Sequence, residues 1–285
     1  MNVLSIDFDF FQDAEVEQLH RYPDGIDYGT KISIVVWSHY YTQKSLSEYM
    51  DVKAIKINRK FFKQMKEIIV AQDETTPVLI VNSHKHIYDF IHEYWNGKDK
   101  CDVWNVDMHH DIFNDNDKLD CGNWGMHIIN DGARLHWIGR QMSIEAYGLG
   151  KVKDFPMEQD FEKIKNKEFD LIFLCRSDTW LPPHLDRYFV EMAKLCCDHF
   201  DRVCGDPDVL VSRMKEISKQ VKSYDEMERQ CHMLSMLQKG RDDEETVKAI
   251  VREYNDSKRA HSRNVSGKQR NTKDTGGTDK GKSGS

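Results

Sequence analysis

The sequence contains no run of 18 or more apolar residues, which is about the length that a membrane-spanning helix requires. Its first residues also lack the basic region and the small-residue cleavage site of a secretory signal peptide. Charged residues make up 31% and hydrophobic residues 39% of the 285-residue chain, a composition typical of a protein that folds in water. We therefore expect a cytoplasmic protein that does not bind a membrane.

Cysteine pairs with the spacing of metal or redox sites are also absent. The chain has seven cysteines, an odd number, and no two of them form a CxxC pair of the kind found in zinc knuckles and thioredoxins. We interpret them as free thiols. The sequence has no GxGxxG segment, no Walker loop and no internal repeat, so dinucleotide and P-loop nucleotide binding are not indicated.

The last part of the chain has almost no apolar residues. From Asp256 onward the sequence is rich in Lys, Arg, Gly, Ser and Thr, and this composition predicts a disordered tail. Eight Lys and Arg against three Asp give the tail a charge of +5, so the total of −7 leaves −12 on the preceding residues. A body this acidic argues against a nucleic-acid-binding core.

Short apolar runs alternate with segments of helical periodicity before the tail. After the opening strand, further strands are predicted at residues 32–37, 52–57, 77–82, 101–106, 134–139 and 170–175. Helices are predicted at residues 59–70, 88–95, 158–165 and 182–200. This alternation indicates a mostly parallel sheet flanked by helices, a three-layer α/β/α fold. We expect this α/β domain over residues 1–205, a helical extension over 206–255 and the basic tail over 256–285.

The opening strand carries two charges among large apolar side chains. It reads LSIDFDFF, and because side chains alternate along a strand, Ser5, Asp7 and Asp9 should face one way and the apolar residues the other. Two buried like charges are costly without a cation or several donors nearby. The pair therefore marks either a solvated strand end or a metal or catalytic site.

Two further predicted strands also end in acidic or imidazole side chains, which are Asp107, His109 and Asp111 after residues 101–106, and His84 after residues 77–82. Ligands of parallel α/β sheets bind at the carboxyl ends of the strands. With the two opening aspartates, these ends offer four carboxylates and two imidazoles. This set suits Mn²⁺, Fe²⁺ or Mg²⁺, and four negative charges balance two divalent cations better than one. The other reading is three unrelated polar strand ends.

These segments resemble the metal-binding motifs of the arginase and ureohydrolase superfamily, which are a histidine motif, a DxHxD motif and an SxDxD motif. The matching segments here read NSHKH, DMHHD and SIDFD. The chain is more similar to an arginase-like family that includes the peptide arginases and carries an LDIDLDFF-type strand and an ENW segment, matched here by LSIDFDFF and GNWGM. The resemblance covers about the first 190 residues, and the SxDxD motif is permuted to the N-terminus.

The resemblance implies an arginase-like three-layer fold and two Mn²⁺ ions per chain, with Asp7 and Asp107 bridging the ions. The remaining ligands would be His84 and Asp111 for one ion, and His109 and Asp9 for the other. A peptide arginase converts arginyl side chains to ornithine and releases urea. The GGDHS context of arginases and their loop for free amino acids are missing here. The expected substrate is therefore an arginine-containing peptide or another small guanidino compound.

The resemblance also implies a mechanism. A hydroxide held between the two metals would attack the guanidinium carbon, and Asp111 would accept a hydrogen bond from it. A histidine is the usual general acid near neutral pH. We expect His127 to deliver a proton to the leaving amine, with His86 and His110 as alternatives.

Recognition of a planar cation calls for a carboxylate that accepts two hydrogen bonds. Asp178, which follows the strand at residues 170–175, is the candidate, although a turn aspartate would occupy the same place. Arg176 would position a carboxylate or a peptide carbonyl of the substrate. Asn123 would shape the pocket together with Trp124, which is equally suited to the core.

Three other readings remain open. A single-metal zinc deacetylase would use adjacent histidines such as those in DMHHD, but it would need fewer carboxylates. A haloacid-dehalogenase-type phosphatase would use Asp7 as a nucleophile, and would leave DMHHD without a role. A non-catalytic interaction protein would keep the metal only to support the fold. The oligomeric state does not follow from the sequence.

Overall fold

In a computed structural model of the chain, the described residues are 1–220 except 24–26, 28, 43–49, 114–116, 149–156 and 159–160, together with 233–234, 236–237, 245, 248–249, 252 and 256. The chain forms two compact units, Met1–Ser223 and Tyr224–Ser285. Within the described residues no helix has the length and apolar character needed to span a membrane.

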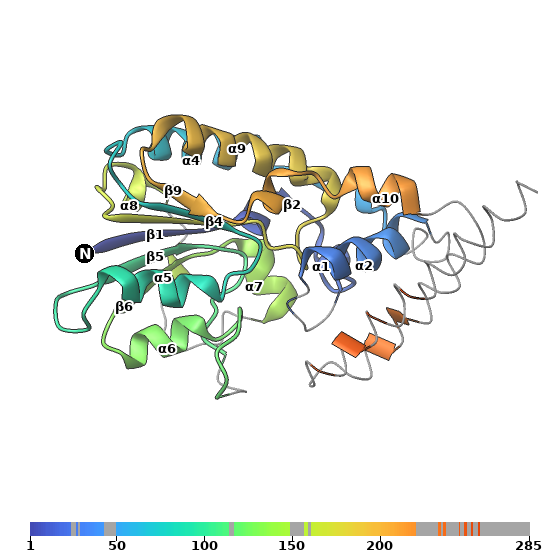
Figure 1. Cartoon of the computed structure of the whole chain (residues 1–285), viewed down its shortest axis with the longest axis horizontal. Coiled ribbons are helices and arrows are strands. Elements are labelled where there is room, and N and C mark those ends of the chain that lie inside the picture. Colours follow the sequence, from blue (N-terminus) through green and yellow to red (C-terminus); the bar gives the residue numbers. More distant parts are fainter. Residues whose placement is uncertain are drawn as a thin grey trace, which may run out of the picture. The chain divides into compact units, whose positions relative to one another are not determined.

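The first unit consists of short strands alternating with helices (Figure 1). The strands are β1 Asn2–Asp7, β2 Gln12–Asp13, β3 Lys56–Ile57, β4 Val78–Val81, β5 Asp102–Val106, β6 Arg134–Ile138, β7 Met157–Glu158, β8 Leu171–Cys175 and β9 Val203–Gly205. The α-helices are α1 Val16–Leu19, α2 Thr30–Thr42, α4 Arg59–Val70, α5 His86–Tyr94, α6 Trp124–Asn130, α7 Gln141–Tyr147, α8 Glu162–Lys165, α9 Asp186–His199 and α10 Met214–Gln220. The 3₁₀ helices are η1 Phe8–Phe11, η2 Val52–Ala54, η4 Pro183–Leu185 and η5 Pro207–Leu210.

Seven strands form one sheet in the order β7-β6-β5-β1-β8-β4-β9, and each neighbouring pair is parallel. β1 lies at the centre, with Val3 in register with Val103 of β5 and with Leu171 of β8. The predicted α/β fold with a mostly parallel sheet is confirmed. Because all strands run the same way, the residues that follow β1, β4, β5 and β8 meet at one edge of the sheet.

Alternation along the strands divides the core into two clusters, one on each face of the sheet. Leu4 and Ile6 of β1 pack in the cluster that includes residues of α4 and α9, whereas Val3 packs in the cluster that includes residues of α5 and α6. Figure 1 shows α4 and α9 above the sheet and α5 and α6 below it. The three-layer α/β/α arrangement is therefore confirmed.

The strand predicted at residues 32–37 is wrong, because these residues lie inside helix α2. An apolar run of six residues does not distinguish a buried strand from a buried helix, and Ile34, Val35, Val36 and Trp37 are all buried. The strand predicted at 52–57 is mostly wrong as well. It forms the 3₁₀ helix η2 and the two-residue strand β3, which pairs with β2.

The first unit continues past Gly205 through η5 and α10. Arg213, which precedes α10, is fully buried and donates hydrogen bonds to Asp186 at the start of α9. Much of the segment predicted as helical beyond residue 220, and all of the predicted tail after Asp256, lies outside the described residues.

Candidate metal centre

The centre begins where β1 ends. The chain leaves the sheet after Asp7 and turns into the 3₁₀ helix η1, whose first turn is capped by Asp7 accepting a hydrogen bond from the Asp9 N–H (3.3 Å). The predicted alternation therefore holds for Ser5 and Asp7, but Asp9 reaches the same region from a 3₁₀ turn and not from the strand. Both carboxylates are buried, so the reading of a solvated strand end is wrong.

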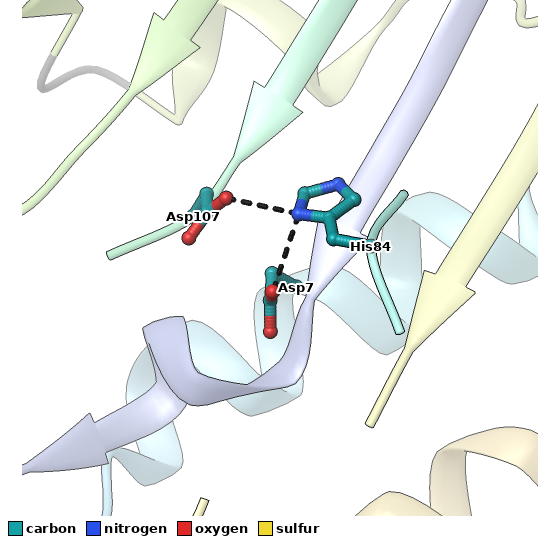
Figure 2. A group of neighbouring side chains, drawn as sticks. All are labelled: Asp7, His84 and Asp107. Carbon is teal, nitrogen blue, oxygen red and sulfur yellow. Dashed lines mark ion pairs between the residues drawn. The ribbon is translucent and has the colours of Figure 1, made fainter. Parts of the chain in front are cut away.

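His84 follows β4 and points across the strand ends to the carboxylates (Figure 2). Its Nδ1 lies 3.2 Å from an oxygen of Asp7, 3.2 Å from one of Asp107 and 2.9 Å from one of Asp111. On the other side of the ring, Nε2 is 2.7 Å from Ser5 Oγ. If Nε2 donates to Ser5, Nδ1 is left with a free lone pair, which is the form of histidine that binds a metal.

The Nδ1 atom of His84 is a buried polar atom that makes no hydrogen bond of acceptable geometry, although three carboxylate oxygens surround it. Nδ1 and the carboxylate oxygens of Asp7 and Asp107 lie within 4.8 Å of one another. An imidazole nitrogen and carboxylate oxygens that converge without hydrogen-bonding one another are the donor set of a divalent cation. The residues present therefore fit a metal ion.

A second group lies beside the first and shares Asp107 with it. Nδ1 of His109 is 3.3 Å from an oxygen of Asp9 and 3.7 Å from one of Asp107. These three residues also place one ligand atom each within 4.8 Å of one another. Buried Asp and His groups of this protein can thus hold a metal ion, and the six residues predicted as ligands lie together.

Burial without a cation changes the protonation of these groups. Burial, together with the nearby carboxylates Asp9 and Asp107, raises the pKa of Asp7 to about 8. Burial and Asp107 raise the pKa of Asp111 to about 7. The pKa of Asp107 is lowered instead, because the neighbouring His109 and His84 outweigh the effect of burial. For His84 burial lowers the pKa, but Asp107 and Asp111 outweigh it and the net shift is upward.

These shifts predict that the chelated protein loses stability as the pH rises from about 4 to about 8. Asp7 and Asp111 keep their protons in the folded state up to higher pH than in the unfolded chain, so the folded state binds more protons across this window. The raised pKa of His84 also lowers the stability as the pH rises above 6.5, the ordinary pKa of a histidine. The slope is about 1.4 kcal/mol per pH unit for each proton.

Thermal unfolding of chelator-treated protein between pH 5 and pH 8 measures this effect. The matched control is Asp7→Asn, which removes one titrating group and should flatten the decline. Stability that rises with pH over this window in the chelated wild type would contradict the account.

Asp111 is held by the segment that follows the DxHxD motif. Its backbone has a positive φ of 53°, a conformation that is strained for a residue other than glycine. Trp124 at the start of α6 donates a hydrogen bond from Nε1 to the Asp111 carboxylate (2.6 Å), and its ring packs against His84 at 4.9 Å between centroids. The buried Trp124 therefore positions two of the candidate ligands at once.

Gly125 allows α6 to pack closely against the backbone of Asp111. Its N–H donates to the Asp111 carbonyl oxygen (2.8 Å), and a Cβ at this position would lie 2.6 Å from that oxygen and 2.7 Å from Leu135. We expect Gly125→Ala to displace α6, to destabilise the fold by about 1–3 kcal/mol and to weaken metal binding. Gly29→Ala is the control, since a Cβ there meets nothing within 4 Å. Thermal unfolding and Mn²⁺ titration of both variants measure the effect; equal results for the two would contradict it.

The three histidines considered as proton donors do not join the cluster. His110 accepts a hydrogen bond from Ile112 N–H (3.1 Å) and packs against Phe113, and burial lowers its pKa to about 4. His127 has its ring beside Tyr88 (6.0 Å between centroids), and His86 is exposed at the start of α5. His110, the neighbour of His109 in the chain, belongs to neither group of candidate ligands. The role of His127 stays a prediction.

The Asp178 carboxylate is hydrogen-bonded to other side chains of the protein. Its carboxylate accepts hydrogen bonds from Nε and Nη2 of Arg176 and from Thr30 Oγ1 (2.6 Å), and it is completely buried. The bidentate pairing predicted for a substrate guanidinium is thus made with Arg176, which also donates to the carbonyl oxygens of Val209 (2.9 Å) and Val211 (3.0 Å). In this arrangement neither Arg176 nor Asp178 offers a group to a substrate.

Asn123 also has a structural partner. Its side chain donates to the Lys118 carbonyl oxygen (2.8 Å) and accepts from the Asp120 N–H (2.8 Å), and so it orders the turn before α6.

Two residues that support the candidate ligands were not predicted. Ser5 holds His84, and its alternation with Asp7 was a usable signal. Ser177, with a φ of 58°, has its Oγ 3.5 Å from Asp9, and nothing in the sequence indicated this contact.

Comparison of the chain with models of protein families, with curated proteins and with solved structures gives no match.

Proposed function

We propose that the protein is a manganese-dependent hydrolase that cleaves a guanidino group, most specifically that of an arginyl side chain in a peptide, with release of urea. The observation that carries the proposal is the pair of ligand groups that share Asp107, each with a histidine Nδ1 beside carboxylates. Four carboxylates and two imidazoles suit Mn²⁺ and balance two divalent charges. The resemblance of the three motifs to arginase-like proteins supports the reaction.

Six residues of the chain would hold the two ions. Asp7, His84, Asp107 and Asp111 would hold one ion, and Asp9 and His109 would hold the other together with Asp107. When bound, such ions supply a nucleophile at neutral pH by lowering the pKa of a water molecule, and they polarise the group under attack. The proposed pairing agrees with the contacts of His84 and His109.

The protein's own residues would orient and shield the reaction. Burial of the four aspartates excludes bulk water. The hydrogen bond from Trp124 fixes one oxygen of the Asp111 carboxylate, and the other oxygen can accept a hydrogen bond. In the overall reaction, water adds to the guanidino carbon and the bond from that carbon to Nε breaks. Nε takes up a proton and leaves as the primary amine of ornithine, and the carbon leaves as urea.

The test is a urea-release assay on Mn²⁺-supplemented protein with an arginyl peptide, free arginine and agmatine as substrates. We expect urea and ornithine in equal amounts from the peptide, and little from free arginine. Asp111→Asn is expected to lower kcat by at least about 100-fold.

An acetyl-lysine peptide and a phosphate monoester serve as further substrates in the same assay. Release of acetate or phosphate without urea would replace the proposal by the deacetylase or the phosphatase reading. A metal-loaded protein that acts on none of the substrates would support the alternative of a non-catalytic interaction protein.

A further inference from the structure

Among the described residues, the candidate metal centre is most exposed at His109. The side chains of five candidate ligands are between 0% and 5% exposed, whereas the side chain of His109 is 15% exposed. His109 is thus the most accessible of the candidate ligands, and a substrate would approach the centre on its side.

Two aromatic rings flank His109. The Tyr147 ring lies 4.9 Å from the His109 ring at an interplanar angle of 44°, and the Trp180 ring lies 5.6 Å away at 59°. Tyr147 is the last residue of α7, and Trp180 lies in the turn after β8, where its N–H donates to the Ser177 carbonyl oxygen. Both are half-buried, so they pack against the core and keep part of their surface exposed.

The position of Trp180 is coupled to the centre through a buried glutamine. Gln12 Nε2 donates to the Trp180 carbonyl oxygen (3.2 Å) and lies 3.8 Å from Met108 Sδ, next to His109 in the chain. Tyr22 in turn donates a hydrogen bond to Gln12 Oε1. Contacts from the interior thus hold the Trp180 backbone in place, so its ring is positioned before a ligand binds.

Three described carboxylates near these rings are already engaged. Asp9 and Asp107 contact His109, and Asp178 is paired with Arg176. Aromatic faces are the other groups that bind a planar, weakly hydrated cation, since the ring quadrupole attracts the charge and the flat guanidinium stacks on the ring. This mode of binding also leaves the metal ligands undisturbed.

We propose that Tyr147 and Trp180 form a cation–π receptor that selects a side chain ending in a planar cation and presents it to the metal centre. The inference rests on the proposed function, because the guanidinium of an arginyl side chain is the cation concerned. Tyr147 and Trp180 are then the residues that determine specificity for charge, and the ligands of the centre perform the chemistry.

The test is equilibrium binding of two peptides to the Mn²⁺-loaded full chain by calorimetry. In one peptide the arginine Nε is replaced by a methylene, which gives an amidinium, a planar cation without a leaving amine. The other carries the uncharged primary amide of the same shape. The wild type should bind the amidinium peptide at least about tenfold more tightly than the amide peptide.

The variants are Tyr147→Leu and Trp180→Leu, with Trp180→Phe as the matched control that keeps a ring. Tyr94→Leu, at an exposed tyrosine of α5, is the distant control. Each leucine variant should lose about tenfold in affinity for the amidinium peptide and little for the amide peptide, with unchanged metal content, whereas both controls keep the preference. If one leucine variant does not fold, the affinities of the other variant test the inference.

Three results would overturn the inference: equal binding of the two peptides by the wild type, no binding of either, or leucine variants that keep the preference. Failure of the proposed function is a separate result. In that case the preference for the amidinium peptide and its loss in the variants are found, but the arginyl peptide yields no urea.

Discussion

Replacing Asp107 with Asn should abolish the binding of both proposed metal ions, whereas replacing His109 with Ala should abolish the binding of one. Asp107 belongs to both groups of candidate ligands, with one oxygen near His84 and the other near His109. His109 belongs to only one group. Because a ligand contributes more to affinity than the residues that orient it, we expect each lost site to bind at least about 100-fold more weakly.

Titration of the metal-free variants with Mn²⁺, followed by calorimetry, measures this difference. The matched control is Asp102→Asn, at the other end of the same strand, where the carboxylate pairs with Arg134 (2.7 Å) and His136 (2.9 Å). The control should bind as the wild type does. Equal losses in Asp107→Asn and His109→Ala, or one retained site in Asp107→Asn, would contradict the shared-ligand arrangement.

Replacing Asp186 with Ala should destabilise the first unit by about 3–5 kcal/mol, because it leaves a fully buried guanidinium without its counter-ion. Arg213 and Asp186 are both completely buried, and Nη2 of Arg213 lies 2.7 Å from the carboxylate. The same guanidinium donates to Ser33 Oγ (3.2 Å) and to the carbonyl oxygens of Leu181 (2.7 Å) and Asp178. This cation therefore fixes the segment before α10 to the core.

Denaturant unfolding of Asp186→Ala, of Arg213→Met and of the double variant Asp186→Leu with Arg213→Met tests this prediction. The double variant removes both charges and should recover much of the loss. Glu191→Ala, which breaks the exposed pair with Lys66 (2.6 Å), is the control and should change stability by less than about 1 kcal/mol. A similar small effect for Asp186→Ala would show that the buried pair does not stabilise the fold.

The parts of the fold that are periodic in sequence were predictable. Helix α4 begins and ends where the pattern predicts, since its apolar residues face the core at helical spacing. The strands β4, β5, β6 and β8 also lie within their predicted runs. Helix α2 was not predictable in this way, because it is buried over consecutive residues and so has no alternation that distinguishes it from a strand.

The candidate ligands could be predicted because a parallel sheet brings its strand ends together, and each ligand follows an apolar run. Residues whose partner is distant in sequence could not be assigned. Asp178 accepts a hydrogen bond from Thr30 and lies near Arg213 (3.8 Å), and no local pattern indicates that either residue would approach it. The contact of Trp124 with Asp111 likewise depends on how closely α6 packs at Gly125.

The most direct test of the central claim is the manganese content of the full-length wild type, purified gently without chelators, reconstituted with Mn²⁺ and measured by elemental analysis against protein concentration. We expect about two ions per chain, because two groups of candidate ligands, one with Asp7 and His84 and the other with Asp9 and His109, share Asp107. One ion per chain would contradict the two-metal hydrolase and favour a single-metal site. A chain that retains no manganese would contradict the metal centre itself.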